Sequence, residues 1–117
     1  MTAYSNSYAN SFPFADRTVQ FGLTALTALS YTVPGDSSHQ YRAKFSFADD
    51  SKVWVGYNVT ATLPTIGTLT QNSSIELNPG KYDGDARYVR GGDVLSFIST
   101  AQVTDVGISL LELPRQL

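Results

Sequence analysis

Two segments of the chain alternate between apolar and polar side chains, and this alternation limits the possible fold more than any other feature of the sequence. QYRAKFSF, residues 40–47, has an apolar or aromatic side chain at every second position, and KVWVGYNV, residues 52–59, repeats the pattern. A period of two places all the apolar side chains on one face of a β-strand, whereas a helix would scatter them around its axis. Both segments are therefore predicted to be half-buried strands.

Three later runs extend this prediction to the rest of the chain. RYVR (87–90), DVLSFIS (93–99) and VGISLLEL (106–113) are short, rich in β-branched or aromatic residues, and bounded by Gly, Asp or Pro. Short strands at close spacing are typical of sandwiches and barrels. For residues 15–117 we predict an all-β fold, an antiparallel, jelly-roll-like β-sandwich of about seven or eight strands. The expected core residues are Phe45, Phe47, Val53, Val55, Leu95, Phe97, Ile108 and Leu110.

Two connecting segments are less clear. DDS, residues 49–51, lies between two predicted strands and is expected to be a short hairpin turn. FGLTALTALSYTV, residues 21–33, has leucines at helical spacing between Leu23 and Leu29, whereas its threonines and the alternation that ends at Val33 favour a strand. We predict a strand for this segment.

The charge of the chain excludes several classes of partner. Charged residues make up 15% of the sequence, the net charge is -2, and cysteine is absent. Binding to nucleic acid by neutralising phosphates requires a basic surface, so nucleic acid is not expected as a partner. A membrane span, a disulfide and a thiolate metal site are also not expected. With no export signal visible, the protein is expected to be made in a host cytoplasm.

Residues 1–14, MTAYSNSYANSFPF, differ from the rest of the chain because they are uncharged and mix aromatic residues with Ser, Asn and Ala. Ser and Asn are poor helix formers, and Pro13 disfavours a helical conformation at Phe12. We therefore predict an extended N-terminal arm over residues 1–14. It is either a frayed tail or a contact segment for a partner, and the contact residues would be Tyr4, Tyr8, Phe12 and Phe14.

The stretch Arg90-Gly91-Gly92-Asp93 has the composition of a phosphate-binding loop. Such a loop needs a helix after it, so that the helix N-terminus meets the anion, but the residues that follow read as a strand. The two glycines are therefore predicted to form a turn.

Other catalytic patterns are weak. The single histidine, His39, lies in a loop-like segment where we expect it to be exposed, and no nucleophile-elbow pattern is present. Carboxylates occur in pairs at 49–50 and at Asp83 and Asp85, but the second pair lacks the remaining ligands of a calcium loop. We expect no catalytic residue, no cofactor and no dedicated metal site, with Ca²⁺ bound between several loops as the open alternative.

Trp54 projects from the face of its strand opposite Val53 and Val55. If that face is exposed, Trp54 is a candidate contact for a sugar or a partner protein. If the strand is buried on both faces, Trp54 belongs to the core. The sequence leaves both interpretations open.

The C-terminal half resembles a known group of proteins. ELNPGKYDGDARYVRGGDVLSFIST followed by VTDVGISLLELP resembles small β-rich structural proteins of tailed bacteriophages, often decoration or cement proteins that bind the capsid exterior. The likeness covers roughly residues 52–114 and consists of a Gly-Asp strand and a final Ile-Ser-Leu strand that ends at Pro114. It implies a trimer of jelly-roll-like sandwiches with extended arms that reach neighbouring subunits.

The resemblance and the weak catalytic patterns lead to one expected function. We expect a non-enzymatic virion structural protein that binds the major capsid protein on the capsid exterior as a homotrimer. Its candidate interface residues are Tyr4, Tyr8, Phe12, Phe14 and Trp54. The alternative is a carbohydrate- or receptor-binding β-sandwich module with Trp54 and tyrosines as the sugar platform, and an enzyme is the least supported class.

Overall fold

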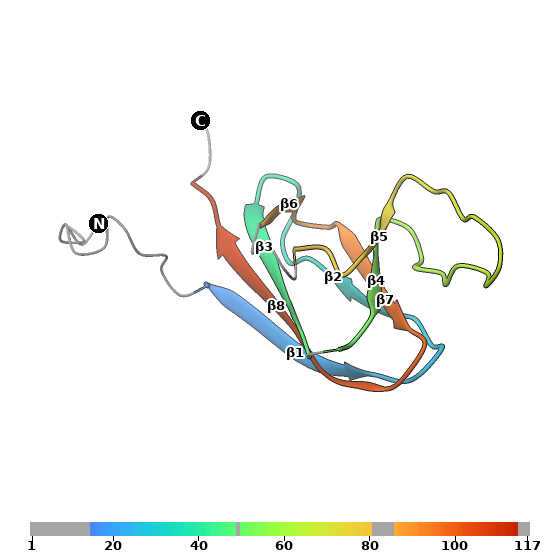
Figure 1. Ribbon diagram of the computed structural model, residues 1–117. Coiled ribbons are helices and arrows are strands. Elements are labelled where there is room, and N and C mark those ends of the chain that lie inside the picture. The colour runs from blue at the N-terminus through green and yellow to red at the C-terminus, as the bar shows by residue number, and fades with distance from the viewer. Residues whose placement is uncertain (1–14, 49, 81–85, 115–117) are drawn as a thin grey trace.

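The computed structural model describes residues 15–48, 50–80 and 86–114, and all regular structure in these ranges is β-strand (Figure 1). No helix long and apolar enough to span a bilayer occurs in them. The eight strands are β1 (Arg17–Leu23), β2 (Leu29–Thr32), β3 (Gln40–Phe47), β4 (Val53–Tyr57), β5 (Ile75–Leu77), β6 (Arg87–Arg90), β7 (Val94–Ser99) and β8 (Val103–Glu112).

The strands form two four-stranded sheets, with the orders β1-β8-β3-β6 and β2-β7-β4-β5. Every pairing is antiparallel. Consecutive strands lie in opposite sheets at every connection except β4 to β5, so the chain crosses from sheet to sheet at almost every turn. This is the strand order of a jelly roll, the double-sheet arrangement that avoids long exposed edges. The predicted antiparallel, jelly-roll-like sandwich is confirmed.

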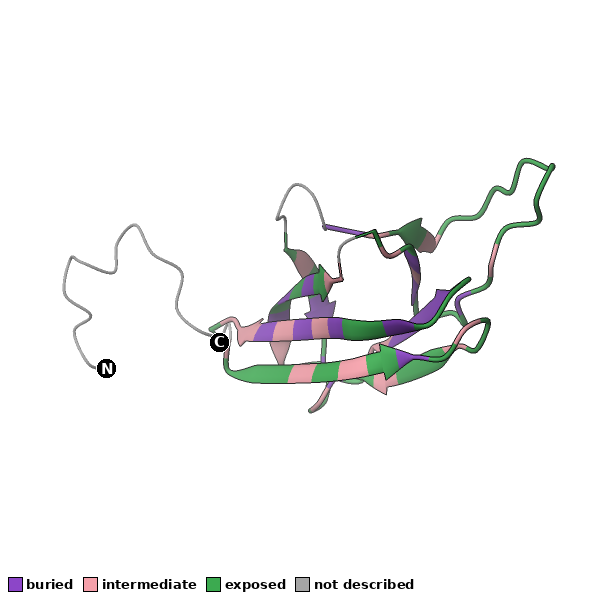
Figure 2. Cartoon of the chain, turned by 60° about the horizontal axis from the view of Figure 1, so that its bottom comes forward, coloured by how far each residue is buried: buried purple, intermediate pink, exposed green. Residues whose placement is uncertain are grey.

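The core lies between the two sheets, and the period-two pattern decides which side chains enter it. Along β3 the buried residues Tyr41, Ala43 and Phe45 alternate with exposed polar ones, and Figure 2 shows similar stripes of burial on other strands. At the centre, the ring of Phe97 is fully buried and meets Phe21 and Phe45 edge to face, with centroids 5.1 and 6.0 Å apart. Aromatic pairs in this geometry add attraction beyond that of buried area alone.

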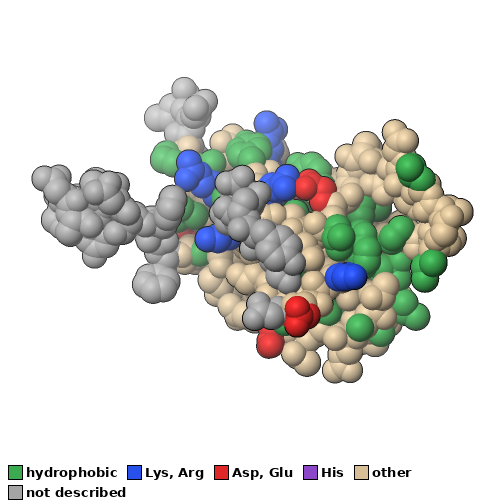
Figure 3. Space-filling model, in the orientation of Figure 1, with side chains coloured by type: hydrophobic (Ala, Val, Ile, Leu, Met, Phe, Trp, Pro, Cys, Tyr) green, Lys and Arg blue, Asp and Glu red, His purple; other side chains and the backbone are tan. Residues whose placement is uncertain are grey.

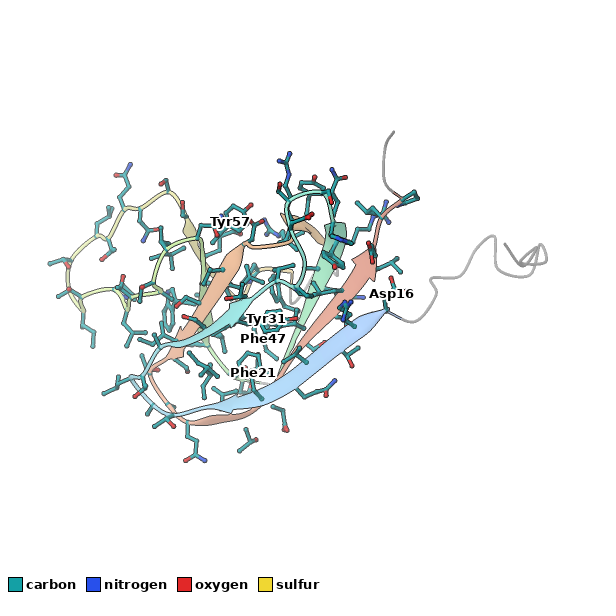
Figure 4. All side chains as sticks on the ribbon, turned by 180° about the vertical axis from the view of Figure 1, so that it is seen from behind. Asp16, Phe21, Tyr31, Phe47 and Tyr57 are labelled. Atoms are coloured by element: carbon teal, nitrogen blue, oxygen red, sulfur yellow. The ribbon has the colours of Figure 1, made fainter. Side chains whose placement is uncertain are left out.

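Seven of the eight predicted core residues are buried, and Phe47 is the exception. Phe47 is the last residue of β3, where the chain leaves for the other sheet, and its side chain is only partly buried against the core. Figure 4 shows it beside Phe21 and Tyr31, which are partly buried in the same way. The alternation correctly indicated the face of Phe47 but not its place at the margin of the sandwich.

The single strand predicted over residues 21–33 is wrong. β1 ends at Leu23 in one sheet and β2 begins at Leu29 in the other. Between them Leu26 has a φ of 63°, and its N–H donates to the carbonyl of Ser99 at 2.8 Å. A strand cannot pass straight between two sheets that lie roughly 10 Å apart, so the segment breaks into two strands and a turn.

The hairpin predicted at residues 49–51 is also wrong, although a turn is present. Ser51 N–H donates to the carbonyl of Ala48 at 3.1 Å, and Asp50 has a φ of 64°. The strands on either side, β3 and β4, belong to different sheets and do not pair with each other. Asp49 itself lies outside the described residues.

Truncation of Phe45 tests the core. Its side chain is 5% exposed and lies between Phe47 and Phe97, so Phe45→Ala is expected to lower the free energy of unfolding by about 3–5 kcal/mol. Tyr88→Ala, at an aromatic side chain that is 48% exposed, is the control and is expected to cost less than about 1 kcal/mol. Urea unfolding followed by circular dichroism measures both, and equal losses would contradict the placement of Phe45.

Candidate functional site

The β4–β5 connection, residues 58–74, is the most prominent surface feature of the described chain. It is the one connection that joins two strands of the same sheet, and it projects away from the sandwich as a long loop (Figure 1). None of its residues is charged. Loops longer than about 12–15 residues without regular structure are uncommon in small domains, and they often carry function.

The base of this loop is fastened to β7. Asn58, with a φ of 57°, donates its N–H to the carbonyl of Val94 at 2.7 Å and accepts the Val94 N–H on Oδ1 at 2.8 Å. Further along, Ala61 N–H donates to the buried hydroxyl of Ser96 at 2.9 Å. At the other end, Tyr57 N–H donates to the carbonyl of Ser74 at 2.9 Å. The loop therefore leaves the sandwich in a defined direction.

The tip of the loop exposes two large apolar side chains. A turn from Thr65 to Thr68, with Gly67 at a φ of 86°, reverses the chain. Ile66 is 100% exposed and Leu69 is 88% exposed. Figure 3 shows hydrophobic side chains at the loop-bearing end of the molecule. Single exposed leucines are ordinary, but two neighbours at the tip of an uncharged loop form a candidate contact for a partner.

Trp54 lies under the same loop, on the outer face of its sheet. The side chain is half-buried, so it is neither in the core between the sheets nor fully exposed. It lines a groove of about 310 Å³ between the outer face of β4 and β5 and the inner side of the loop. Besides Trp54, the lining includes Leu77 of β5 and the loop residues Thr62, Thr70, Gln71 and Asn72.

A second hollow, of about 390 Å³, opens between the two sheets where β5 and β6 form their edges. Its floor is the core itself, including Phe45 and Leu95. On its rim, Arg87 and Glu76 make a bidentate ion pair, with hydrogen bonds of 2.8 and 3.0 Å, that joins β6 of one sheet to β5 of the other. Because this pair fastens the edges of the sandwich together, we assign the hollow a structural role.

Asp93 is the centre of the most connected polar cluster. It accepts hydrogen bonds from the Tyr57 hydroxyl at 2.7 Å, from Arg90 N–H at 2.8 Å and from Asn58 Nδ2 at 3.3 Å. Burial alone would raise the pKa of Asp93, but these three donors outweigh it and lower the pKa below its ordinary value of 3.8. The hydrogen bond between Tyr57 and Asp93 also raises the pKa of Tyr57, because the hydroxyl is held as a donor to the carboxylate.

The Arg90-Gly91-Gly92-Asp93 stretch is a turn, as predicted, and its N–H groups already have hydrogen-bond acceptors. The N–H groups of Gly91, Gly92 and Asp93 donate to the carbonyls of His39, Val33 and Arg90, at 2.8, 2.8 and 3.1 Å. A phosphate-binding loop must instead direct such N–H groups at its ligand. The turn joins β6 of one sheet to β7 of the other, so its role is to carry the chain across the sandwich.

His39 lies in the β2–β3 loop, as expected, but its side chain is 29% exposed and therefore half-buried. Its Nδ1 lies 2.9 Å from Oε2 of Glu112, near the end of β8. Glu112 N–H in turn donates to Oδ2 of Asp16, just before β1, at 2.7 Å. These contacts fasten a loop and the first strand to the last one.

Some predicted positions lie outside the described residues. They are Tyr4, Tyr8, Phe12 and Phe14 of the arm, together with Asp49, Asp83 and Asp85. In the described ranges, no group of three or more His, Cys, Asp or Glu side chains lies close enough together to hold a metal ion.

Sequence reasoning missed the loop tip. The available signal was the long uncharged run between the strands at 53–57 and 75–77, which is too long for an ordinary hairpin. Comparisons with protein-family models, with curated proteins and with solved structures find no match to this chain.

Alanine substitutions test the turn. Gly92 has a φ of 90° with open space around it, so Gly92→Ala is expected to cost about 1 kcal/mol of stability from backbone strain. At Gly91 an added Cβ would collide with the backbone of Gly35 and Asp36, so Gly91→Ala is expected to cost more, about 1–3 kcal/mol.

The control for these variants is Gly107→Ala, where a Cβ meets only ordinary contacts, and it is expected to lie within about 0.5 kcal/mol of the wild type. Chemical denaturation measures all three variants. Calorimetric titration of the intact protein with phosphate should give no binding heat, and saturable binding there would contradict the structural role of the turn.

Acid unfolding tests the Asp93 cluster. A carboxylate whose pKa is lowered on folding contributes stability above its unfolded pKa, and that stability is lost as the pH falls through the folded pKa. Asp93→Asn is expected to cost about 1 kcal/mol at pH 7, since solvent screens a partly exposed carboxylate. The difference from the wild type should shrink below about pH 4. Asp105→Asn, at an exposed carboxylate of β8, is the control. A difference that stays constant with pH would contradict the assignment.

Proposed function

We propose that this chain is a non-enzymatic virion structural protein that binds the outer surface of a phage capsid as a decoration or cement protein. The observation that carries the proposal is the apolar tip of loop 58–74, where Ile66 is 100% and Leu69 is 88% exposed. An isolated domain gains nothing by holding these side chains in water. When a partner buries them, the removal of their apolar surface from water favours binding.

The charge of the surface favours a protein as the partner. The loop carries no charge and the whole chain has a net charge of -2. Binding to nucleic acid or to an anionic bilayer depends on Lys and Arg near the contact, and the loop has neither. A protein surface is recognised by apolar fit and by hydrogen bonds, which the threonines around Ile66 supply. The proposed partner is the major capsid protein.

Two ends of the molecule are available for attachment. Asp16, at the start of the described chain, lies at the opposite end of the sandwich from loop 58–74 (Figure 4). The arm of residues 1–14 joins the sandwich at that end and, like the loop, carries no charge. A subunit with contacts at both ends can bridge two neighbours, which is the task of a cement protein. The arm contacts in this proposal are Tyr4, Tyr8, Phe12 and Phe14.

A homotrimer would strengthen weak contacts of this kind. Once one loop tip is docked, the others are held near their own sites at a high effective concentration, and the overall affinity rises without any new type of contact. Such a role requires no catalytic group. The polar clusters around Asp93, Arg87 and His39 each fasten one part of the fold to another, in keeping with a structural protein.

The test is capsid attachment by loop-tip variants. Ile66→Ser/Leu69→Ser is expected to weaken co-sedimentation with empty capsids at least tenfold, about 1.4 kcal/mol, because the apolar contact is lost. The capsids are assembled from the major capsid protein encoded nearest to this chain. The melting temperature should stay unchanged, since neither side chain packs in the sandwich. Leu26→Ser, at a leucine 66% exposed in the β1–β2 turn, is the matched control.

The same experiment also tests the N-terminal arm. Deletion of residues 2–14 is expected to weaken trimer assembly or capsid attachment by at least tenfold, with the sandwich still folded. Vesicles of neutral and anionic lipid are tested in parallel. Equal attachment by the double variant and the Leu26→Ser control would refute the loop-tip contact. If the protein binds vesicles and not capsids, the partner is a membrane and the capsid proposal is wrong.

A further inference from the structure

The Trp54 groove has the composition of a sugar site rather than that of a packing gap. Its floor is formed by Trp54 and Leu77, side by side on the outer face of β4 and β5, where the two residues pair across the sheet. Its wall includes the exposed loop residues Thr62, Thr70, Gln71 and Asn72, and Pro64 and Ile75 complete the lining. An indole side chain therefore lies next to hydroxyl and carboxamide groups.

We propose that this groove binds a neutral saccharide, with one sugar ring stacked on the indole of Trp54. The C–H face of a pyranose ring is apolar and suits the face of an indole, while its hydroxyls need both donors and acceptors around the edge. Carboxamide side chains such as that of Gln71 supply both. The described residues that line the groove include no charged side chain, so neither a phosphate nor an acidic sugar is favoured.

The size of the groove fits a short stretch of saccharide. At about 310 Å³ it lies at the lower end of the volumes of small-molecule sites, which run from roughly 300 to 1,000 Å³. An open groove of this kind holds one or two rings and lets a longer chain continue at either side. The ligand class is therefore a neutral oligosaccharide or polysaccharide.

A purely structural role for Trp54, as a support for the loop, explains less. The loop is already fastened elsewhere, by Asn58 on Val94 and by Ala61 on Ser96. Asn72 makes a further local contact, since its Oδ1 accepts the Ile75 N–H at 3.2 Å. The loop therefore does not need a partly exposed indole as its anchor.

The saccharide groove and the loop tip use different residues, so a failure of saccharide binding can be distinguished from a failure of capsid attachment. Ile66 and Leu69 do not line the groove, and the groove residues do not form the tip turn. Variants of one feature therefore serve as controls for the other.

The experiment uses the chain's single tryptophan as its reporter. The full-length protein is titrated with maltohexaose, cellohexaose, laminarihexaose and chitohexaose, and with a hyaluronan hexasaccharide as the charged comparison. At least one neutral probe is expected to shift Trp54 emission with saturation in the micromolar to millimolar range. Gln71→Ala is expected to weaken that binding about three- to tenfold, as loss of a ligand hydrogen bond does.

Two further variants keep the test decisive. Thr70→Val is expected to weaken binding, whereas Thr65→Val, the same change at the loop tip and outside the groove, is expected to leave it unchanged. Trp54→Ala, measured by retention on the immobilised probe, is expected to abolish binding, and circular dichroism checks its fold. The proposal is overturned if none of the neutral probes binds up to 10 mM, if only the hyaluronan hexasaccharide binds, or if Gln71→Ala and Thr70→Val bind as tightly as Thr65→Val.

Discussion

The structure depends on β7, whose residues after Val94 are buried on both of its faces. Its inward face places Phe97 at the centre of the core, in edge-to-face contact with Phe21 and Phe45. Its outward face carries Ser96, whose hydroxyl accepts the Ala61 N–H at the base of the β4–β5 loop. The same strand therefore holds the two sheets together and fixes the loop that carries the candidate contacts. A polar residue is tolerated there because its hydrogen bond is satisfied by the loop.

The fold also depends on the turns that carry the chain from one sheet to the other. Each crossing needs a tight turn whose backbone groups find partners, since buried N–H and C=O groups left unpaired are costly. At the β6–β7 crossing, the N–H groups of Gly91 and Gly92 donate to carbonyls of the β2–β3 loop, and the Asp93 carboxylate accepts three hydrogen bonds. Through Tyr57 and Asn58, that cluster also sets the start of loop 58–74. The turn from Arg90 to Asp93, whose composition suggests a phosphate-binding loop, thus serves to join the two sheets and to orient loop 58–74.

Much of the fold could be predicted from the sequence because strand faces are local. The alternation at 40–47 and 52–59, together with the short runs at 93–99 and 106–113, correctly predicted an all-β fold, and seven of the eight predicted core residues are buried. It could not distinguish a hairpin from a crossing between sheets, because the local pattern of the strands is the same in both, and this explains the error at 49–51. The margin of the sandwich, where Phe47 is only partly buried, is likewise set by topology. The arm residues that the sequence singled out lie outside the described chain, so their role stays a prediction.

The candidate sites were less accessible to sequence reasoning, because both depend on how one loop is held. Trp54 could be placed on the outer face of its strand, but only the fold shows that Thr62 and residues 70–72 form a wall beside it. The apolar tip and the polar wall belong to the same loop, with Ile66 and Leu69 between Thr62 and Thr70. If both proposals hold, a partner that fixes the tip also restricts the wall that the proposed saccharide contacts. By thermodynamic linkage the effect is mutual: a saccharide that orders the wall lowers the entropy cost of docking the tip by the same free energy.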